Sequence, residues 1–293
     1  MTNEAPSKPE ERGEAAPESA SGARWILGLA LLVGLARFWK LGAWSLWFDE
    51  AATWTDWFVG IESGEIQNPL GYRLVHATVG LLGGRPDEFA LRFLPAVAGF
   101  LAIPATAWAF RPIASRRTAA IAALLVAASS WQVYWSQNAR FYTLTELATL
   151  LGAGVWLRAF LGGSALRALL GLAITGAGAF FHPSAALLVP ALLVAPGVAL
   201  LRARFVLGPR KRLLLFLWGG ALIAALFAIP WARATLSTYF LQKGSAGPFA
   251  NPVQTLERLG HLAKTTGFYF TPYLGAAALV GLVLAWRKRE LGG

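Results

Sequence analysis

The sequence predicts an all-helical (all-α), polytopic integral membrane protein with about eight transmembrane helices. Of its 293 residues, 56% are hydrophobic and only 14% are charged, whereas soluble globular domains carry about a quarter charged residues. Apolar runs close to the ~20 residues that a helix needs to cross a bilayer recur along the chain. Basic residues gather in short clusters between these runs, at 111–117, 201–212 and 287–290, which is typical of loops held in the cytoplasm.

The first element is a tail that we expect to be disordered and cytoplasmic. Residues 1–23 are rich in Pro, Glu, Ala and Ser and contain no apolar run, so they cannot bury enough surface to fold. They also lack the basic start and directly following apolar core of a secretory signal peptide.

Eight apolar segments follow the tail and form the predicted transmembrane domain, residues 24–288. Two connections are long, residues 43–89 and 232–267, and we expect interfacial amphipathic helices in the first of them. The fifth span is short and glycine-rich. With ends uncertain by several residues, the spans lie near 24–42, 90–110, 118–135, 143–160, 168–182, 184–201, 213–231 and 268–286.

The distribution of charge predicts the orientation. With the tail inside, the cytoplasmic segments between and after the spans hold thirteen Lys/Arg residues against one acid, whereas the outer segments hold nine basic and nine acidic residues. Because Lys and Arg are enriched in cytoplasmic loops, both termini are expected inside, with 289–293 as the cytoplasmic end. The acidic residues of the loops therefore fall on the outer face.

Several functional classes find no support in the sequence. The net charge is +11, but no nucleic-acid-binding motif accompanies it. Cysteine is absent, which excludes a disulfide framework and a thiolate nucleophile. There is no glycine-rich phosphate loop, no paired-histidine helix and no GxSxG sequence. The three histidines are far apart in sequence and do not favour a zinc site.

An acidic stretch, "SLWFDEAATWTDW", follows the first span. If residues 45–58 form an α-helix, one face carries Asp49, Thr53 and Asp56, and the opposite face carries Trp47, Ala51, Trp54 and Phe58. This pattern favours a helix in the membrane interface with its aromatic face toward lipid. The acids could simply solvate such a helix, but Asp49 is the better catalytic candidate because it closely follows a span.

Other polar residues share this outer level. Arginines at helix ends often only reach toward lipid headgroups, a histidine before proline could be a turn residue, and we expect His76 to be packed. Together, however, they suit a site, since a carboxylate can act as a general base and a guanidinium can bind phosphate. The candidates beside Asp49 are Asn68, Arg92, Arg140, Tyr142 and His182.

Five ordered motifs resemble one known family. The segments "WFDEA", "NPLGYRLVHATVGLLG", "DEFALRFLPAVAGFLAIP", "SSWQVYWSQNARFYTLTELATLL" and "FFHPSAALLVPALL" resemble the polyprenyl-phosphate-dependent C-type glycosyltransferases. The nearest branch looks like the protein O-mannosyltransferases and bacterial aminoarabinose-transferase-like proteins. The resemblance runs from about residue 24 to residue 200.

The resemblance implies a role for each matching residue. Asp49 would be the catalytic carboxylate that activates the acceptor hydroxyl, with Glu50 supporting it as the second member of an acid pair. Arg92 would hold the donor phosphate, and Arg140 and Tyr142 would line the same site. His182 matches a frequent histidine at the next outer turn.

Two departures from the family pattern affect this reading. Gln67, Asn68 and Pro69 stand where the family often has His-Pro-Pro, which alters a potential metal or phosphate contact. Many members also continue beyond the last span with an outer domain that recognises acceptors. We therefore expect a compact member, a fragment, or a subunit whose partner supplies acceptor recognition.

The leading functional hypothesis is an inverting glycosyltransferase in the bacterial inner membrane, with its site on the outer face. Its partners would be a polyprenyl-phosphate-linked sugar, membrane lipid and a protein, lipid or glycan acceptor, without nucleic acid; a divalent cation such as Mg²⁺ or Mn²⁺ could assist. One alternative is a transporter or flippase of lipid-linked sugar, which would more often carry ionisable residues or broken helices near the bilayer midplane, whereas the middles of spans two, three and six lack charge. The other alternative is a non-catalytic scaffold subunit.

Overall fold

The computed structural model describes residues 20–59, 68–162, 164–182 and 185, and every regular element in these ranges is a helix. The all-helical prediction is therefore confirmed for this part of the chain. In order, the elements are α1 (Ala20–Gly34), the 3-10 helix η1 (Leu35–Phe38), α2 (Phe48–Val59), α3 (Pro69–Leu81), α4 (Glu88–Phe110), α5 (Arg116–Ala128), α6 (Ser130–Ser136), α7 (Tyr142–Gly162) and α8 (Ala165–Gly178).

Two of these helices are long and apolar enough to cross a membrane. They are Ser21–Phe38, with 18 residues, and Glu88–Phe110, with 23 residues, which correspond to about 27 Å and about 35 Å of helix against a hydrocarbon core of about 30 Å. Helices α5 and α6 make a third span if they are taken together, although they are bent by 61° at their junction. These three match the first three predicted spans.

The remaining predicted spans have less support. Helix α7 covers the fourth but carries Glu146 and Arg158, and α8 covers the fifth with only 14 residues. The sixth, seventh and eighth spans, and the second long outer segment, lie outside the described residues. Most of the predicted tail does too, but α1 begins at Ala20, inside the stretch expected to be disordered.

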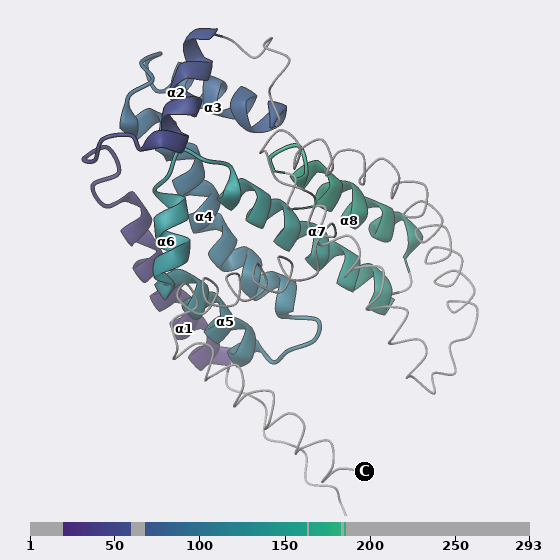
Figure 1. Cartoon of the computed structure of the whole chain (residues 1–293). Coiled ribbons are helices and arrows are strands. Elements are labelled where there is room, and N and C mark those ends of the chain that lie inside the picture. The colour runs from purple at the N-terminus through teal and green to yellow at the C-terminus, as the bar shows by residue number, and fades with distance from the viewer. Residues whose placement is uncertain (1–19, 60–67, 163, 183–184, 186–293) are drawn as a thin grey trace, which may run out of the picture.

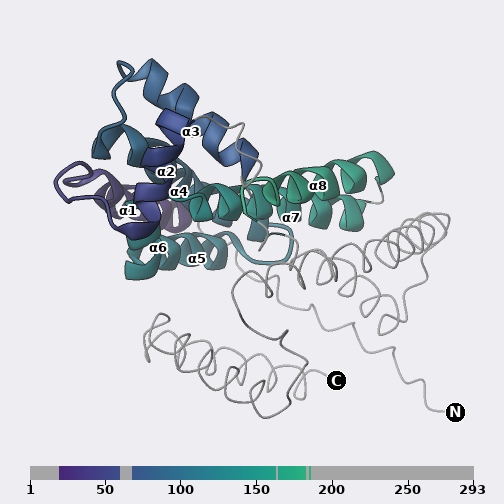
Figure 2. The same ribbon diagram turned by 45° about the horizontal axis from the view of Figure 1, so that its top comes forward.

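Helix α4 occupies the middle of the described bundle. It packs against α1, α3, α5, α6 and α7, while α7 lies along α8 and α1 lies along α5 (Figure 1). Small residues allow these close approaches; a side chain at Gly99 of α4, for example, would collide with Ser136 of α6. Helices α2 and α3 lie together at one end of the bundle (Figures 1 and 2).

Several helix starts are specified by local sequence. Asp87 accepts a hydrogen bond from the backbone of Ala90 (2.8 Å) and caps α4. Ser115 caps α5 and Ser129 caps α6 in the same way. Pro69 opens α3, where its missing N–H costs nothing because a first-turn donor has no partner within the helix.

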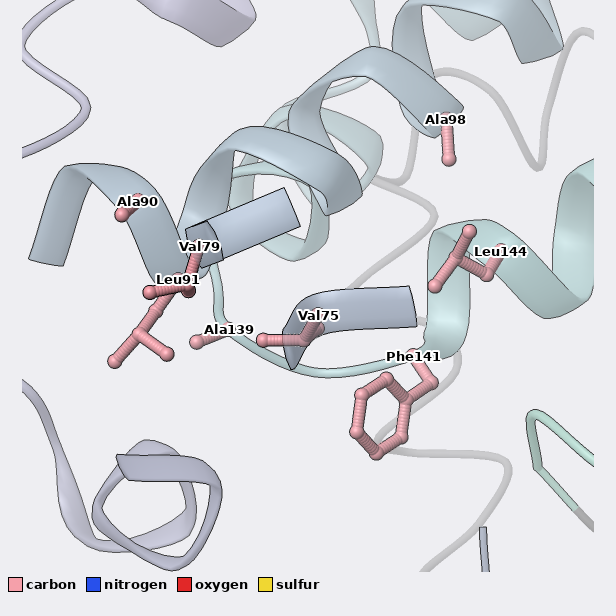
Figure 3. Close-up of a cluster of buried hydrophobic side chains, with 8 residues drawn as sticks. All are labelled: Val75, Val79, Ala90, Leu91, Ala98, Ala139, Phe141 and Leu144. Atoms are coloured by element: carbon pink, nitrogen blue, oxygen red, sulfur yellow. The ribbon is translucent and has the colours of Figure 1, made fainter. Parts of the chain in front are cut away.

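A buried apolar cluster fixes the turn between α6 and α7. It joins side chains of α3, α4, the turn and α7, namely Val75, Val79, Ala90, Leu91, Ala98, Ala139, Phe141 and Leu144 (Figure 3). Tyr72 lies edge-on to Phe141 with ring centroids 4.8 Å apart. A side chain at Gly71 would clash with the Phe141 ring. This packing holds residues 137–141, which include Arg140, at the end of the bundle where α2 and α3 lie.

Candidate active site

Helix α2 presents a polar stripe to the protein and aromatic residues to its surroundings. Glu50, Thr53 and Asp56, spaced three residues apart, are buried, whereas Phe48 and Phe58 are 88% and 63% exposed. The predicted amphipathic helix is therefore present, but its inward face centres on Glu50. Thr53 and Asp56 lie on the predicted polar face, and Asp49 lies half-buried at its edge.

The Glu50 carboxylate is buried and its acceptor positions are filled. Oε1 accepts from Arg92 Nε and from the backbone N–H of Ala139, both at 2.7 Å. Oε2 accepts from Arg92 Nη2 at 2.7 Å and from the backbone N–H of Trp47 at 3.2 Å. The Trp47 contact satisfies a backbone donor at the start of α2, as a glutamate in the first turn of a helix often does.

Arg92 uses all five of its N–H donors inside the protein. Besides the two bonds to Glu50, Nη1 donates to the carbonyls of Leu41 (3.1 Å) and Trp44 (2.9 Å), and Nη2 donates to that of Ser45 (3.1 Å). Its side chain is only 3% exposed. No guanidinium proton is left for a donor phosphate, so the phosphate-binding role expected for Arg92 does not fit this structure. Arg92 instead fixes Glu50 and the segment 41–45 that leads into α2.

Asp49 and Arg140 meet at the start of α2. Arg140 Nη1 donates to the backbone carbonyl of Asp49 at 3.1 Å, and Arg140 Nε is buried with no hydrogen-bond partner among the residues that the structure describes. The Asp49 carboxylate accepts no hydrogen bond from the described residues. Within the described residues, a carboxylate and a guanidinium with unused hydrogen-bonding capacity therefore lie in the same region.

Helix α2 holds the turn that carries Arg140 by binding both backbone groups of Ala139. Glu50 accepts from the Ala139 N–H, and Thr53 Oγ1 donates to the Ala139 carbonyl at 2.8 Å. The indole N–H of Trp47 donates to Asn138 Oδ1. Sequence reasoning proposed none of Trp47, Thr53 and Asn138 as site residues. For Trp47 and Thr53 the local signal is their three-residue spacing from Glu50, although Trp47 directly precedes α2 and was expected on its lipid-facing side. Asn138 has no such signal.

Tyr142 and His182 lie beside this turn. Their ring centroids are 4.7 Å apart. The ring of Trp135, on α6, lies 4.2 Å from the ring of Tyr142, the first residue of α7. Burial and the positive charge of Arg140 lower the pKa of His182, with burial the larger cause. His182 follows the end of α8 and lies close enough to Arg140 for the positive charge of the guanidinium to act on the imidazole.

Asn68 and Asp56 are also buried, at the start of α3 and near the end of α2. The Asn68 side chain does not cap the first turn of α3. Asp56 Oδ2 lies 3.2 Å from His76 Nε2, but the two atoms are not aligned as a hydrogen bond. Burial raises the pKa of Asp56, and His76 offsets part of this effect. His76 is packed edge-on against Trp57, as expected, with an acidic partner that sequence reasoning did not assign.

These side chains combine a base with an anion-binding group. The Asp49 carboxylate could accept a proton from a hydroxyl, and Arg140 could hold an anion. Within the described ranges, no group of three or more His, Asp or Glu residues is placed to hold a metal ion. Comparison of the chain with protein-family models, curated proteins and solved structures gave no match.

Proposed function

We propose that the protein is a membrane glycosyltransferase that moves a sugar from a polyprenyl-phosphate donor to a hydroxyl or phosphate acceptor on the outer face. The observation that carries this proposal is the meeting of Asp49 and Arg140 at the start of α2. The exposed aromatic face of α2 suits a site at the lipid–water boundary, where a lipid-linked donor would arrive. The eight-span topology, cytoplasmic termini and bacterial inner membrane belong to the same proposal.

In this mechanism, Asp49 accepts the proton of the acceptor hydroxyl as its oxygen attacks the anomeric carbon of the sugar. The bond between that carbon and the donor phosphate oxygen breaks in the same displacement, which inverts the configuration. The phosphate leaves with the electron pair, and Arg140 stabilises its negative charge. A phosphate acceptor would attack as an anion and would not need the base.

The other predicted residues support these two groups. Glu50 and Arg92 hold the start of α2 and the turn at Ala139, so they position Asp49 and Arg140. Tyr142 and His182 lie next to Arg140. A Mg²⁺ ion typically uses one or two carboxylates together with substrate phosphate, but binding to Asp49 would occupy the proposed base. We therefore assign neutralisation of the phosphate to Arg140.

Two alternatives remain distinguishable. The bend between α5 and α6, with buried Arg37 at the break, favours a flippase of lipid-linked sugar, because broken helices and buried charges mark transport paths. A flippase would move the donor across vesicles without forming a glycosylated product. A scaffold would do neither, and substitution of Asp49 would leave both measurements unchanged.

The test is Asp49→Asn assayed in membranes with radiolabelled polyprenyl-phosphate mannose and polyprenyl-phosphate aminoarabinose. Removal of a general base should lower turnover about 10²- to 10⁴-fold while donor binding is retained. Asp87→Asn is the matched control, because Asp87 is an exposed acid and asparagine also caps a helix. Unchanged transfer in Asp49→Asn, or an equal loss in Asp87→Asn, would remove Asp49 from the proposed role.

A further inference from the structure

Arg37 is the most deeply buried cation of the described chain, with a side chain that is 0% exposed. It lies in η1, directly after α1, within the first candidate span. Its Nη1 donates to the carbonyl of Ala127 at 3.1 Å and its Nη2 to that of Val126 at 3.0 Å. Both carbonyls belong to the last turn of α5, where carbonyl groups lack partners within the helix and the helix dipole is negative.

The chain bends where Arg37 binds. Helices α5 and α6 meet at 61°, and Ser129 between them accepts a hydrogen bond from the backbone of Gln132, which caps α6. Arg37 thus binds two carbonyls in the last turn of α5, of which that of Val126 also accepts a hydrogen bond from the backbone N–H of Ser129 at 3.4 Å. Ser129 satisfies a donor on the other side of the break. The charged group at this break is Arg37 of η1, the segment that directly follows α1.

The far end of α6 is attached to the same segment. Gln137 Nε2 donates to the carbonyls of Ala36 (3.1 Å) and Trp39 (3.0 Å). Residues 36–39 therefore fix the end of α5 before α6 and the residue directly after α6. Arg140 follows Gln137 by three residues, in the turn that also contacts Asp49.

We infer that Arg37 is a positioning residue of the candidate site: by closing the broken end of α5 it sets the direction of α6 and so places Arg140 beside Asp49. This inference rests on the proposed function, in which Arg140 binds the donor phosphate. A planar guanidinium suits the role because it donates to two neighbouring carbonyls at once, which a lysine ammonium on a flexible stem does less well.

Within the described residues, Arg37 is buried without full pairing. Its Nε is buried without a hydrogen-bond partner, and Glu146 on α7 acts on it electrostatically without making an ion pair within 4 Å among the described residues. Gln132 donates to Glu146 at 2.8 Å. Replacing an incompletely paired buried guanidinium with an apolar side chain of similar size removes its desolvation cost, which offsets part of the loss of its two hydrogen bonds. Arg37→Met should therefore retain the folded protein and lose the alignment of α6.

The experiment combines donor kinetics with a distance measurement. Because the chain has no cysteine, spin labels can be attached at Ile121→Cys on α5 and Tyr134→Cys on α6, which are 41% and 47% exposed. Arg37→Met and Arg37→Lys are compared with Arg24→Met, an exposed arginine of α1. For Arg37→Met we expect a shifted or broadened label distance and a KM for polyprenyl-phosphate sugar raised about tenfold to a hundredfold, with a smaller change in acceptor KM. Arg37→Lys should recover part of both, and Arg24→Met should change neither.

The outcomes separate this inference from the proposed function. An unchanged label distance in Arg37→Met overturns the inference, as does a changed distance with unchanged donor KM. If Arg37→Met does not fold, Arg37→Lys decides by the same two measurements. If wild-type protein transfers no sugar from either donor, the proposed function fails, and the label distance still shows whether Arg37 sets the bend.

Discussion

Two neighbouring acids, Asp49 and Glu50, have opposite environments. Glu50 is 1% exposed and pairs with Arg92 through two bonds of 2.7 Å, whereas Asp49 is half-buried with its carboxylate unused by the described residues. Charge burial of this kind is costly unless every hydrogen bond is made. Full pairing suits Glu50 and Arg92 to a rigid support, and the free carboxylate suits Asp49 to chemistry.

The Glu50–Arg92 pair should be strongly coupled in stability. Glu50→Leu or Arg92→Met alone leaves a buried unpaired charge and should lower the free energy of unfolding by about 3–5 kcal/mol. The double variant removes both charges and should lose clearly less than the sum of the two single losses. Thermal unfolding of the purified proteins in detergent measures this, with Asp49→Asn as a control of small effect. Additive losses would show that the pair is not a unit.

The sequence pattern placed Asp49 on the polar face of α2, whereas in the structure Glu50 is the buried acid of the pair. Asp49 and Glu50 differ by 100° on a helix, so both fit an amphipathic pattern approximately. The inward position is decided by Arg92 and Ala139, which lie 42 and 89 residues away from Glu50. The same is true of Arg92, whose motif indicated a phosphate contact while its actual partners are carbonyls at Leu41, Trp44 and Ser45.

At the scale of the helix, α2 joins the site to α3. Its inward stripe begins with Trp47, Glu50 and Thr53 on the Arg140 turn and ends with Asp56 against His76 of α3. The helix itself was predictable, because its aromatic outer face follows the 3.6-residue period. The contact with His76 was not, because nothing local in sequence relates positions 56 and 76.

The pH dependence of stability should report the Asp56 contact. Because burial raises the pKa of Asp56, ionisation of this group costs the folded state more than the unfolded state. Its contribution to stability is therefore present below its ordinary pKa and is lost as the pH rises from about 4 toward the raised value. The melting temperature of Asp56→Asn, relative to wild type, should be higher at pH 7 than at pH 4.

A second variant checks the cause of this pH effect. His76 lowers the pKa of Asp56 and partly offsets burial. In His76→Gln, the loss of stability with rising pH should therefore extend to higher pH than in wild type. An identical pH profile in wild type, Asp56→Asn and His76→Gln would mean that this contact does not contribute to stability.

For the whole molecule, hydropathy and charge predicted eight spans, and the described residues contain two candidate spans, or three if α5 and α6 are taken as one. The first and second spans were predictable because apolar length has one simple cause, the thickness of the bilayer. The third was predicted as a continuous span, but the helices α5 and α6 are bent by 61° at their junction, where Ser129 caps α6 and Arg37 binds a carbonyl of α5. The contact with Arg37 is long-range and has no local pattern in the sequence. Helix α7 carries Glu146 and Arg158 and is not among the candidate spans of the described residues, although it packs along α4 and α8.

The orientation of α4 gives a direct test of the membrane arrangement. Arg85 precedes this helix and Thr118 follows it, and both are exposed. If α4 crosses the bilayer with its start outside, a membrane-impermeant maleimide should label Arg85→Cys in intact cells and Thr118→Cys only after permeabilisation. The absence of native cysteine makes the unmodified chain the blank, and a permeant maleimide should label both positions. Labelling of both from one side would show that α4 does not separate them, and Asp49 and Arg140 could then no longer be placed at the outer face.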